Sequence, residues 1–157
     1  GILPAMGRGG VVAGVPGDTK EQALRAAVDL IPNLGPEERR SVHAKLMERE
    51  GLSSTGIGHG IALPHPRSDP GILLALPRIT TCFLVRPVDF DAVDGRPVSV
   101  LMVMLSGSTR LHLSLLSKLS FHLRDHAFRE LLLSAPPAEI LLQKVAGMEA
   151  GASGDGT

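Results

Sequence analysis

The stretch that most constrains this chain runs from Thr55 to Arg67, where three glycines fall within five residues and a histidine then stands between two prolines. Glycine permits positive φ, and a proline disfavours the helical region for the residue before it. Leu63 and His65 should therefore both be extended. We expect a stiff surface loop, neither helix nor central strand, that points one imidazole in a defined direction. A ring nitrogen that must meet a phosphoryl group in line is one nucleophile that needs such a loop.

Composition narrows the class of protein. A chain of 157 residues with 43% hydrophobic residues suits one domain with a sizeable core and is too apolar for a disordered chain. Sixteen basic residues balance sixteen acidic ones, so no global charge favours nucleic acid. A single cysteine excludes an internal disulfide and a zinc site built from cysteines. No apolar run is long enough to span a membrane, so we expect a soluble, cytoplasmic domain without membrane insertion.

Local signals before the glycine stretch predict two helices. Residues 1–17 contain six glycines and two prolines, and we interpret them as a linker or the edge of an upstream module that leads into a short strand. Thr19 and Gln22 fit a capping box, and apolar residues follow at helical spacing. A proline and two glutamates at 36–38 begin a second helix, with Gly51 as its expected C-cap.

Beyond the glycine stretch, the pattern alternates strands and helices. Residues 79–85 are rich in β-branched types, as in a strand, and 98–105 are nearly continuous apolar, as in a strand buried on both faces. Asp94-Gly95 between them is typical of a hairpin turn. Helices are expected from about 109 to 123, from the Asp125 cap to about 133 and from Pro136-Pro137 to 145, followed by a disordered tail at 147–157. This order predicts an α/β single-domain layered fold with a mixed β-sheet flanked by helices.

Two histidines are the main candidates for chemistry. His65 is the proposed nucleophile, because the prolines around it remove backbone donors and leave carbonyls that can fix its tautomer. His112 heads an apolar helix face, at spacings of 4, 3 and 4 with Leu116, Leu119 and Leu123. The positive end of that helix would lower the pKa of its imidazole and attract phosphate. From the residues alone, a core histidine at position 112 is an equally good interpretation.

Three other residues are candidate phosphate contacts. Arg67 could pair with phosphate oxygens, although surface arginines are common, and Thr55 and Ser106 could donate hydroxyl hydrogen bonds, although such residues more often serve as caps. A remote alternative is a metal-binding domain that uses His59, His65 and His112 as ligands. The pattern otherwise requires no cofactor and no metal.

Three segments, in this order along the chain, carry a family resemblance: Gly56-Ile57-Gly58-His59-Gly60-Ile61-Ala62-Leu63-Pro64-His65, Phe90-Asp91-Ala92-Val93-Asp94-Gly95-Arg96-Pro97-Val98 and His112-Leu113-Ser114-Leu115-Leu116-Ser117-Lys118-Leu119. They resemble enzyme IIA of the phosphoenolpyruvate-dependent phosphotransferase system, fructose/mannitol type, including its nitrogen-regulatory relatives. We place the enzyme IIA-like domain at residues 18–146. Two positions depart from the family pattern: Pro66 stands where small residues are frequent, and His59 where Asn is frequent.

The resemblance implies that His65 accepts a phosphoryl group from a histidine-phosphorylated carrier protein, with His112 as the second histidine of the site. Two roles are compatible with it. In a regulatory role, phosphorylation alters binding to a partner protein or to an upstream DNA-binding module, and the leader is faintly similar to the end of an excisionase-like helix-turn-helix module. In a transport role, the phosphoryl group passes to a sugar-specific enzyme IIB. We favour regulation, since negative charge added at His65 would change a docking surface.

Overall fold

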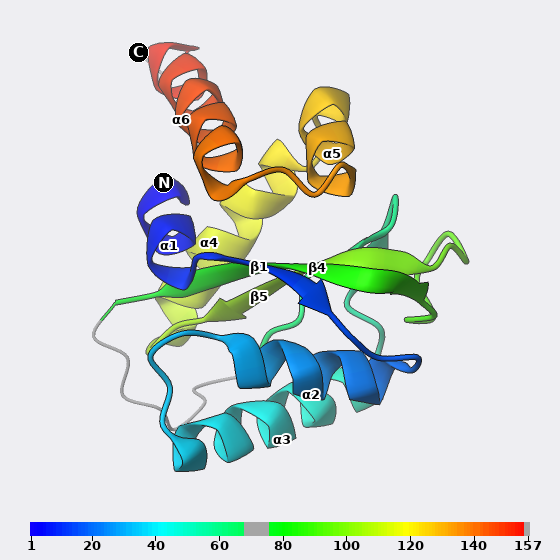
Figure 1. Cartoon of the computed structure of the whole chain (residues 1–157). Coiled ribbons are helices and arrows are strands. Elements are labelled where there is room, and N and C mark those ends of the chain that lie inside the picture. Colours follow the sequence, from blue (N-terminus) through cyan, green and yellow to red (C-terminus); the bar gives the residue numbers. More distant parts are fainter. Residues whose placement is uncertain (68–75, 156–157) are drawn as a thin grey trace.

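The computed structural model describes the backbone of residues 1–67 and 76–155. Within these residues, a five-stranded mixed sheet lies between two layers of helices (Figure 1), which confirms the predicted α/β layered fold. The elements are α1 (Leu3–Gly9), β1 (Val11–Val15), α2 (Lys20–Leu30), α3 (Pro36–Leu52), β2 (Gly56–Gly58), β3 (Ile61–Ala62), β4 (Arg78–Val88), β5 (Val98–Leu105), α4 (Thr109–His122), α5 (His126–Leu133) and α6 (Ala138–Asp155).

The strands are ordered β1-β4-β5-β3-β2, so β5 lies at the centre of the sheet. It pairs antiparallel with β4 and parallel with β3, whereas β1 runs parallel to β4 and β2 antiparallel to β3. Leu101 and Val103 of β5 face the layer of α2 and α3, while Met102 and Met104 face α1, α4, α5 and α6. Every described residue of β5 except Ser99 is buried, which confirms the prediction that this strand is covered on both faces.

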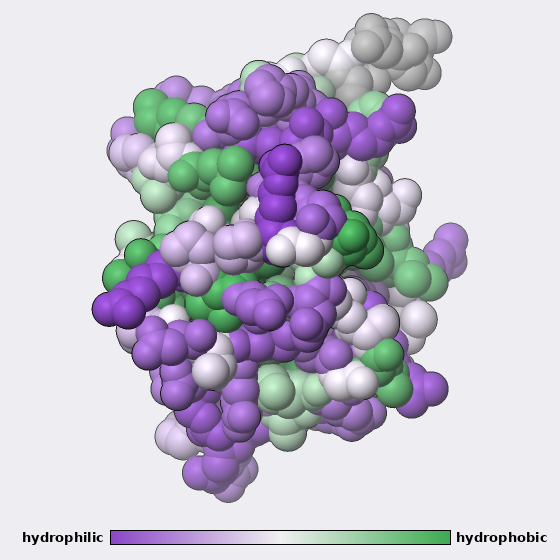
Figure 2. Space-filling view, turned by 90° about the vertical axis from the view of Figure 1, so that its right-hand side faces the viewer, coloured by the Kyte–Doolittle hydropathy of each residue, from purple (hydrophilic) through white to green (hydrophobic). Residues whose placement is uncertain are grey.

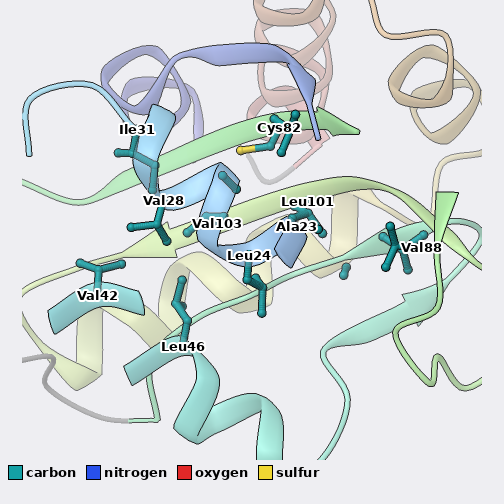
Figure 3. Packing of buried hydrophobic residues seen from close by; sticks show 14 of the residues in the cluster. Ala23, Leu24, Val28, Ile31, Val42, Leu46, Cys82, Val88, Leu101 and Val103 are labelled. Atoms are coloured by element: carbon teal, nitrogen blue, oxygen red, sulfur yellow. The ribbon is translucent and has the colours of Figure 1, made fainter. Parts of the chain in front are cut away.

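The layer of α2 and α3 follows the capping signals. The Thr19 hydroxyl accepts the Gln22 N–H at 3.2 Å, but the Gln22 side chain accepts from the Asp18 N–H at 2.9 Å and not from Thr19, so the expected box is shifted by one residue. The helix α3 continues past the expected C-cap Gly51 and ends at Leu52, and the Arg49 guanidinium donates to the carbonyl of the residue that follows, Ser53, at 2.7 Å. Figure 3 shows the apolar side chains of both helices directed at the sheet, with Cys82 buried among them.

The expected linker at the start of the chain is wrong, because its apolar residues pack as part of the domain. Ile2, Ala5 and Met6 are buried in the core on the α4 side of the sheet. Gly9 lets α1 approach β4 closely, since a Cβ there would lie 2.1 Å from the Ile79 carbonyl oxygen. Val11 then begins β1, the strand expected at this point.

The expected disorder at the other end is also wrong for the residues described, since α6 continues through Gly147 to Asp155. Gly147 borders open space, so it costs the helix only about 1 kcal/mol relative to alanine. Contacts beyond it offset this cost: Met148 packs against the core, and the Glu149 carboxylate accepts the Leu3 N–H at 2.7 Å. The two ends of the described chain are therefore joined through α1 and α6.

The connection between β4 and β5 forms the end of the molecule that lies on the right in Figure 1. It contains the expected turn, with Gly95 at a φ of 73° and its N–H bound to the Ala92 carbonyl at 2.9 Å. Figure 2 views this end and shows a largely hydrophilic surface with small, separate hydrophobic patches. Among the described helices, none is both long and apolar enough to cross a membrane.

Candidate functional site

The glycine stretch is a tight hairpin that joins the sheet, and in this respect the expected loop is wrong. Gly56–Ala62 forms β2 and β3, because the turn between them satisfies the backbone geometry that a two-residue hairpin requires. His59 and Gly60 both have positive φ, at 59° and 78°. The His59 N–H also donates to the Asp94 carboxylate at 2.8 Å, which ties the turn to the connection between β4 and β5.

The segment after β3 is extended, as predicted, and carries His65 along the end of β5. The Pro64 carbonyl accepts the Met104 N–H at 2.9 Å, so the backbone before the histidine continues the parallel pairing. His65 Nδ1 lies 2.7 Å from the Leu63 carbonyl oxygen. A carbonyl oxygen can only accept, so Nδ1 carries the proton and Nε2 keeps its lone pair. The structure thus supplies the carbonyl that a histidine nucleophile needs to fix its tautomer.

The second predicted histidine lies against the first. Ser108 caps α4 by accepting the Leu111 N–H at 3.2 Å, and His112 is the fourth residue of that helix. Its own N–H is bound to the Ser108 carbonyl, so only the ring is available for a ligand. The ring centroids of His65 and His112 are 4.8 Å apart, with the planes inclined at 40°. His112 Nε2 is buried and has no hydrogen-bond partner among the described residues.

Both imidazoles are held in the neutral form at pH 7. Burial lowers the pKa of His65, and the charge of Arg49 lowers it further, against the opposing effects of the Leu63 carbonyl and Glu50. Burial and the neighbouring His65 lower the pKa of His112 to about 4. A neutral His65 with a lone pair on Nε2 is the reactive form for attack on phosphorus.

The three predicted phosphate contacts differ in whether their side chains are already hydrogen-bonded within the protein. The Thr55 hydroxyl donates to the Glu50 carboxylate, and the Ser106 hydroxyl donates to the Ser108 carbonyl at 3.1 Å. Each hydroxyl has one proton, so either residue would have to release its present acceptor before it could donate to a phosphoryl oxygen, and both assignments stay predictions. Arg67 is exposed two residues after His65 in the chain and remains a candidate.

The sequence argument missed Arg49, which lies near His65 at the end of α3. Its guanidinium is positioned by bonds to the Ser53 carbonyl and hydroxyl, and its positive charge acts on the pKa of His65. A basic residue in the last turn of a helix usually just complements the helix dipole, so it gave no distinctive signal. Its position in the turn that leads directly into the glycine hairpin is the feature that could have indicated it.

The metal-site alternative is wrong for the described part of the chain. It needs His59 beside His65 and His112, but His59 lies at the hairpin turn, six residues before His65 and on the far side of β3 in the chain. Within residues 1–67 and 76–155, no three side chains of His, Cys, Asp or Glu are placed to hold a metal ion. The site therefore consists of two neutral imidazoles and a nearby guanidinium.

Comparisons with known proteins agree with this geometry. The model of a protein family, the phosphoenolpyruvate-dependent sugar phosphotransferase system EIIA 2, matches residues 10–145. The nitrogen regulatory protein of Pseudomonas aeruginosa is 39% identical over 140 residues, which cover 87% of this chain and 89% of that protein. The fructose-specific EIIA component of the phosphotransferase system of Haloferax volcanii is 35% identical over 123 residues, covering 76% of this chain and 78% of that protein.

A solved structure gives the same result. The crystal structure of the nitrogen regulatory protein IIA-Ntr from Neisseria meningitidis matches with a TM-score of 0.76 and 29% identity, covering 90% of this chain and 97% of that one. The family match spans most of the chain and includes the hairpin, His65 and His112. The chain therefore belongs to the EIIA 2 family of the phosphoenolpyruvate-dependent sugar phosphotransferase system and is a phosphoryl-relay component of that system.

Proposed function

We propose that this protein is a cytoplasmic phosphoryl relay in which His65 Nε2 accepts a phosphoryl group from a histidine-phosphorylated carrier protein, in a regulatory role. One observation carries the choice of acceptor: the bond from His65 Nδ1 to the Leu63 carbonyl leaves Nε2 unprotonated. His112 has no comparable anchor, since the described residues offer its Nε2 no partner.

The transfer is a single in-line displacement. The lone pair of His65 Nε2 forms the new N–P bond while the N–P bond of the carrier's phosphohistidine breaks, and its electron pair returns to the carrier's imidazole. The proton on Nδ1 stays in place, held by the Leu63 carbonyl. No nucleotide is consumed at this step, so the protein contributes positioning and charge stabilisation.

His112 and Arg49 stabilise the transferring group in this proposal. A neutral His112 with its proton on Nε2 can donate to a phosphoryl oxygen, which would satisfy the buried ring nitrogen that lacks a partner. The guanidinium of Arg49 adds positive charge near the same point, and Arg67 adds a second one from the exposed side.

The regulatory role rests on relatives. The Pseudomonas aeruginosa and Neisseria meningitidis proteins are named as nitrogen regulatory proteins, whereas the Haloferax volcanii relative is a fructose-specific EIIA component. An upstream DNA-binding module stays a prediction from the sequence, and residues 2–9 themselves pack into this domain. The second candidate is thus a transport role, with an enzyme IIB as the phosphoryl acceptor.

Two measurements test the proposal. Incubation with phosphoenolpyruvate, enzyme I and the carrier should give an acid-labile phosphate on the wild-type protein and none on His65→Ala; label persisting in that variant would refute the acceptor. The isolated phosphoprotein is then mixed with a fructose-type enzyme IIB and its sugar. Stable phosphate supports regulation, and rapid sugar-dependent loss of phosphate would show a transport component.

A further inference from the structure

A buried carboxylate lies behind the site and takes no part in the phosphoryl step described above. Glu50, in the last turn of α3, is only 6% exposed. Its Oε2 accepts the Thr55 N–H at 2.8 Å and lies 3.2 Å from Lys20 Nζ, while its Oε1 accepts the Thr55 hydroxyl. Burying a carboxylate costs free energy unless it is paired and hydrogen-bonded, so this arrangement needs a reason beyond ending a helix.

Glu50 is linked to the reactive imidazole by a continuous series of hydrogen bonds. It holds the N–H and the hydroxyl of Thr55, and the Thr55 carbonyl accepts the Leu63 N–H at 3.0 Å. The Leu63 carbonyl in turn accepts the proton of His65 Nδ1 at 2.7 Å. Leu63 is 2% exposed, so neighbouring residues restrict its movement as well. Each link sets the position of the next.

We propose that Glu50 is a positioning residue, which fixes the direction and the tautomer of the His65 imidazole through Thr55 and Leu63. This inference rests on the proposed function, in which His65 Nε2 is the phosphoryl acceptor. Without the carboxylate, Thr55 loses both of its bonds at this point, and the Leu63 carbonyl is free to shift relative to the ring. A misplacement of about 1 Å at a reacting group can lower a rate by about 100-fold.

The negative charge of Glu50 favours phosphorylation of His65, as its positioning of the ring does. When Nε2 bonds to phosphorus while Nδ1 keeps its proton, the ring becomes cationic, and a nearby carboxylate stabilises it. Lys20, at the start of α2, balances that carboxylate in the unphosphorylated protein through the contact at 3.2 Å. Glu50 and Arg49 lie side by side in the chain and shift the pKa of His65 in opposite directions.

The main test compares Glu50→Gln with the matched control Glu48→Gln, which removes one exposed charge from the same helix. Single-turnover phosphorylation by the carrier should slow by about 10-fold or more in Glu50→Gln, at an unchanged half-saturating carrier concentration. In ¹⁵N NMR spectra, His65 should become a mixture of tautomers, whereas it should remain protonated on Nδ1 in Glu48→Gln. A rate within twofold of the control, with the tautomer retained, would overturn the proposal.

A second variant distinguishes a specific effect on the position of His65 from a general loss of structure. Thr55→Val keeps the backbone bond to Glu50 and the pair with Lys20 but removes the hydroxyl link, so it should shift the tautomer and the rate in the same direction by a few-fold. If Glu50→Gln does not fold, an unchanged His65 tautomer in Thr55→Val overturns the proposal and a changed one supports it. Rate losses accompanied by altered amide shifts throughout α4 and β5 would mean that Glu50 is merely structural.

The two proposals fail in different ways. If wild-type protein is not labelled on His65, the proposed function is wrong, and the tautomer comparison still decides whether Glu50 positions the ring. If wild-type protein and Glu50→Gln are labelled equally fast, the proposed function stands and the role of Glu50 is wrong.

Discussion

His65 and His112 touch each other but are held by different frameworks. His65 lies on an extended segment between two prolines, with Nδ1 bound to a backbone carbonyl at 2.7 Å. His112 lies on α4, where the backbone is fully bonded and the ring nitrogen Nε2 has no partner among the described residues. The first framework prepares a lone pair for attack, and the second leaves a buried ring nitrogen without a partner. Two histidines in contact can therefore have unequal roles.

The largest expected effect is the loss of the acceptor. His65→Asn should abolish phosphorylation, because an amide nitrogen has no lone pair available for attack on phosphorus. Its folding should be preserved, since the side chain is half-buried and its one described bond is to the Leu63 carbonyl, which an amide can replace. Phosphate incorporation measured beside a thermal unfolding curve checks this. Incorporation at the wild-type rate would place the acceptor elsewhere.

The next largest effect is expected when His112, the proposed hydrogen-bond donor to the phosphoryl group, is replaced. His112→Ala should slow phosphoryl transfer by about 100-fold, the usual loss when one preorganised donor to a developing charge is removed. His112→Gln, which retains an N–H near the position of Nε2, should recover part of the rate. His126→Ala, at an exposed position on α5, is the control. Equal rates in all three variants would make His112 an ordinary core histidine.

A smaller effect concerns stability and pH. Because burial lowers the pKa of His112 to about 4, the unfolded chain binds more protons than the folded one between about pH 6.5 and pH 4. Stability should therefore be constant above that window and fall as the pH falls through it. Burial lowers the pKa values of His65 and His43 as well, so they contribute in the same direction.

Urea unfolding of the wild-type protein and of His112→Gln at pH 7 and pH 5 measures how much His112 contributes to this pH dependence of stability. The variant should lose less stability between the two pH values than the wild type. An equal loss in both proteins would show that His112 is protonated in the folded state as readily as in the unfolded one.

The smallest effect is expected at His59, the histidine that the fold keeps away from the site. Asn tolerates positive φ well, so His59→Asn should keep the turn at its φ of 59° and change the unfolding free energy by no more than about 0.5 kcal/mol. Phosphorylation should be unaffected. A slower rate in this variant would extend the site to the hairpin turn.

The sequence predicted those parts of the fold whose signals are local. The continuous apolar run of β5 and the Ser108 cap of α4 each depend on neighbouring residues, and both elements form as expected. The strand β3 depends on pairing with β5, β2 depends on pairing with β3, and α1 depends on β4 and α6. Such partners lie far away in the sequence, so glycine content alone suggested a loop and a linker.

The candidate site shows the same division between features with local sequence signals and features that depend on distant residues. His65 could be predicted because prolines and glycines beside it define its backbone, and the face of α4 predicted the place of His112. The contributions of Arg49 and Glu50 could not, because they depend on how the end of α3 meets the hairpin and the start of α2. The assignments of Thr55 and Ser106 stay predictions, and the sequence did not reveal the nearby acceptors to which both hydroxyls are bonded in this structure.

The central claim is that His65 reacts through Nε2 because Leu63 holds the proton on Nδ1. Its most direct test is ³¹P and ¹⁵N NMR spectroscopy of the protein after phosphorylation by phosphoenolpyruvate, enzyme I and the carrier. We predict a single phosphohistidine with the phosphorus bonded to Nε2 of His65 and a protonated Nδ1. A phosphoryl group on Nδ1 of His65, or on His112, would contradict the account.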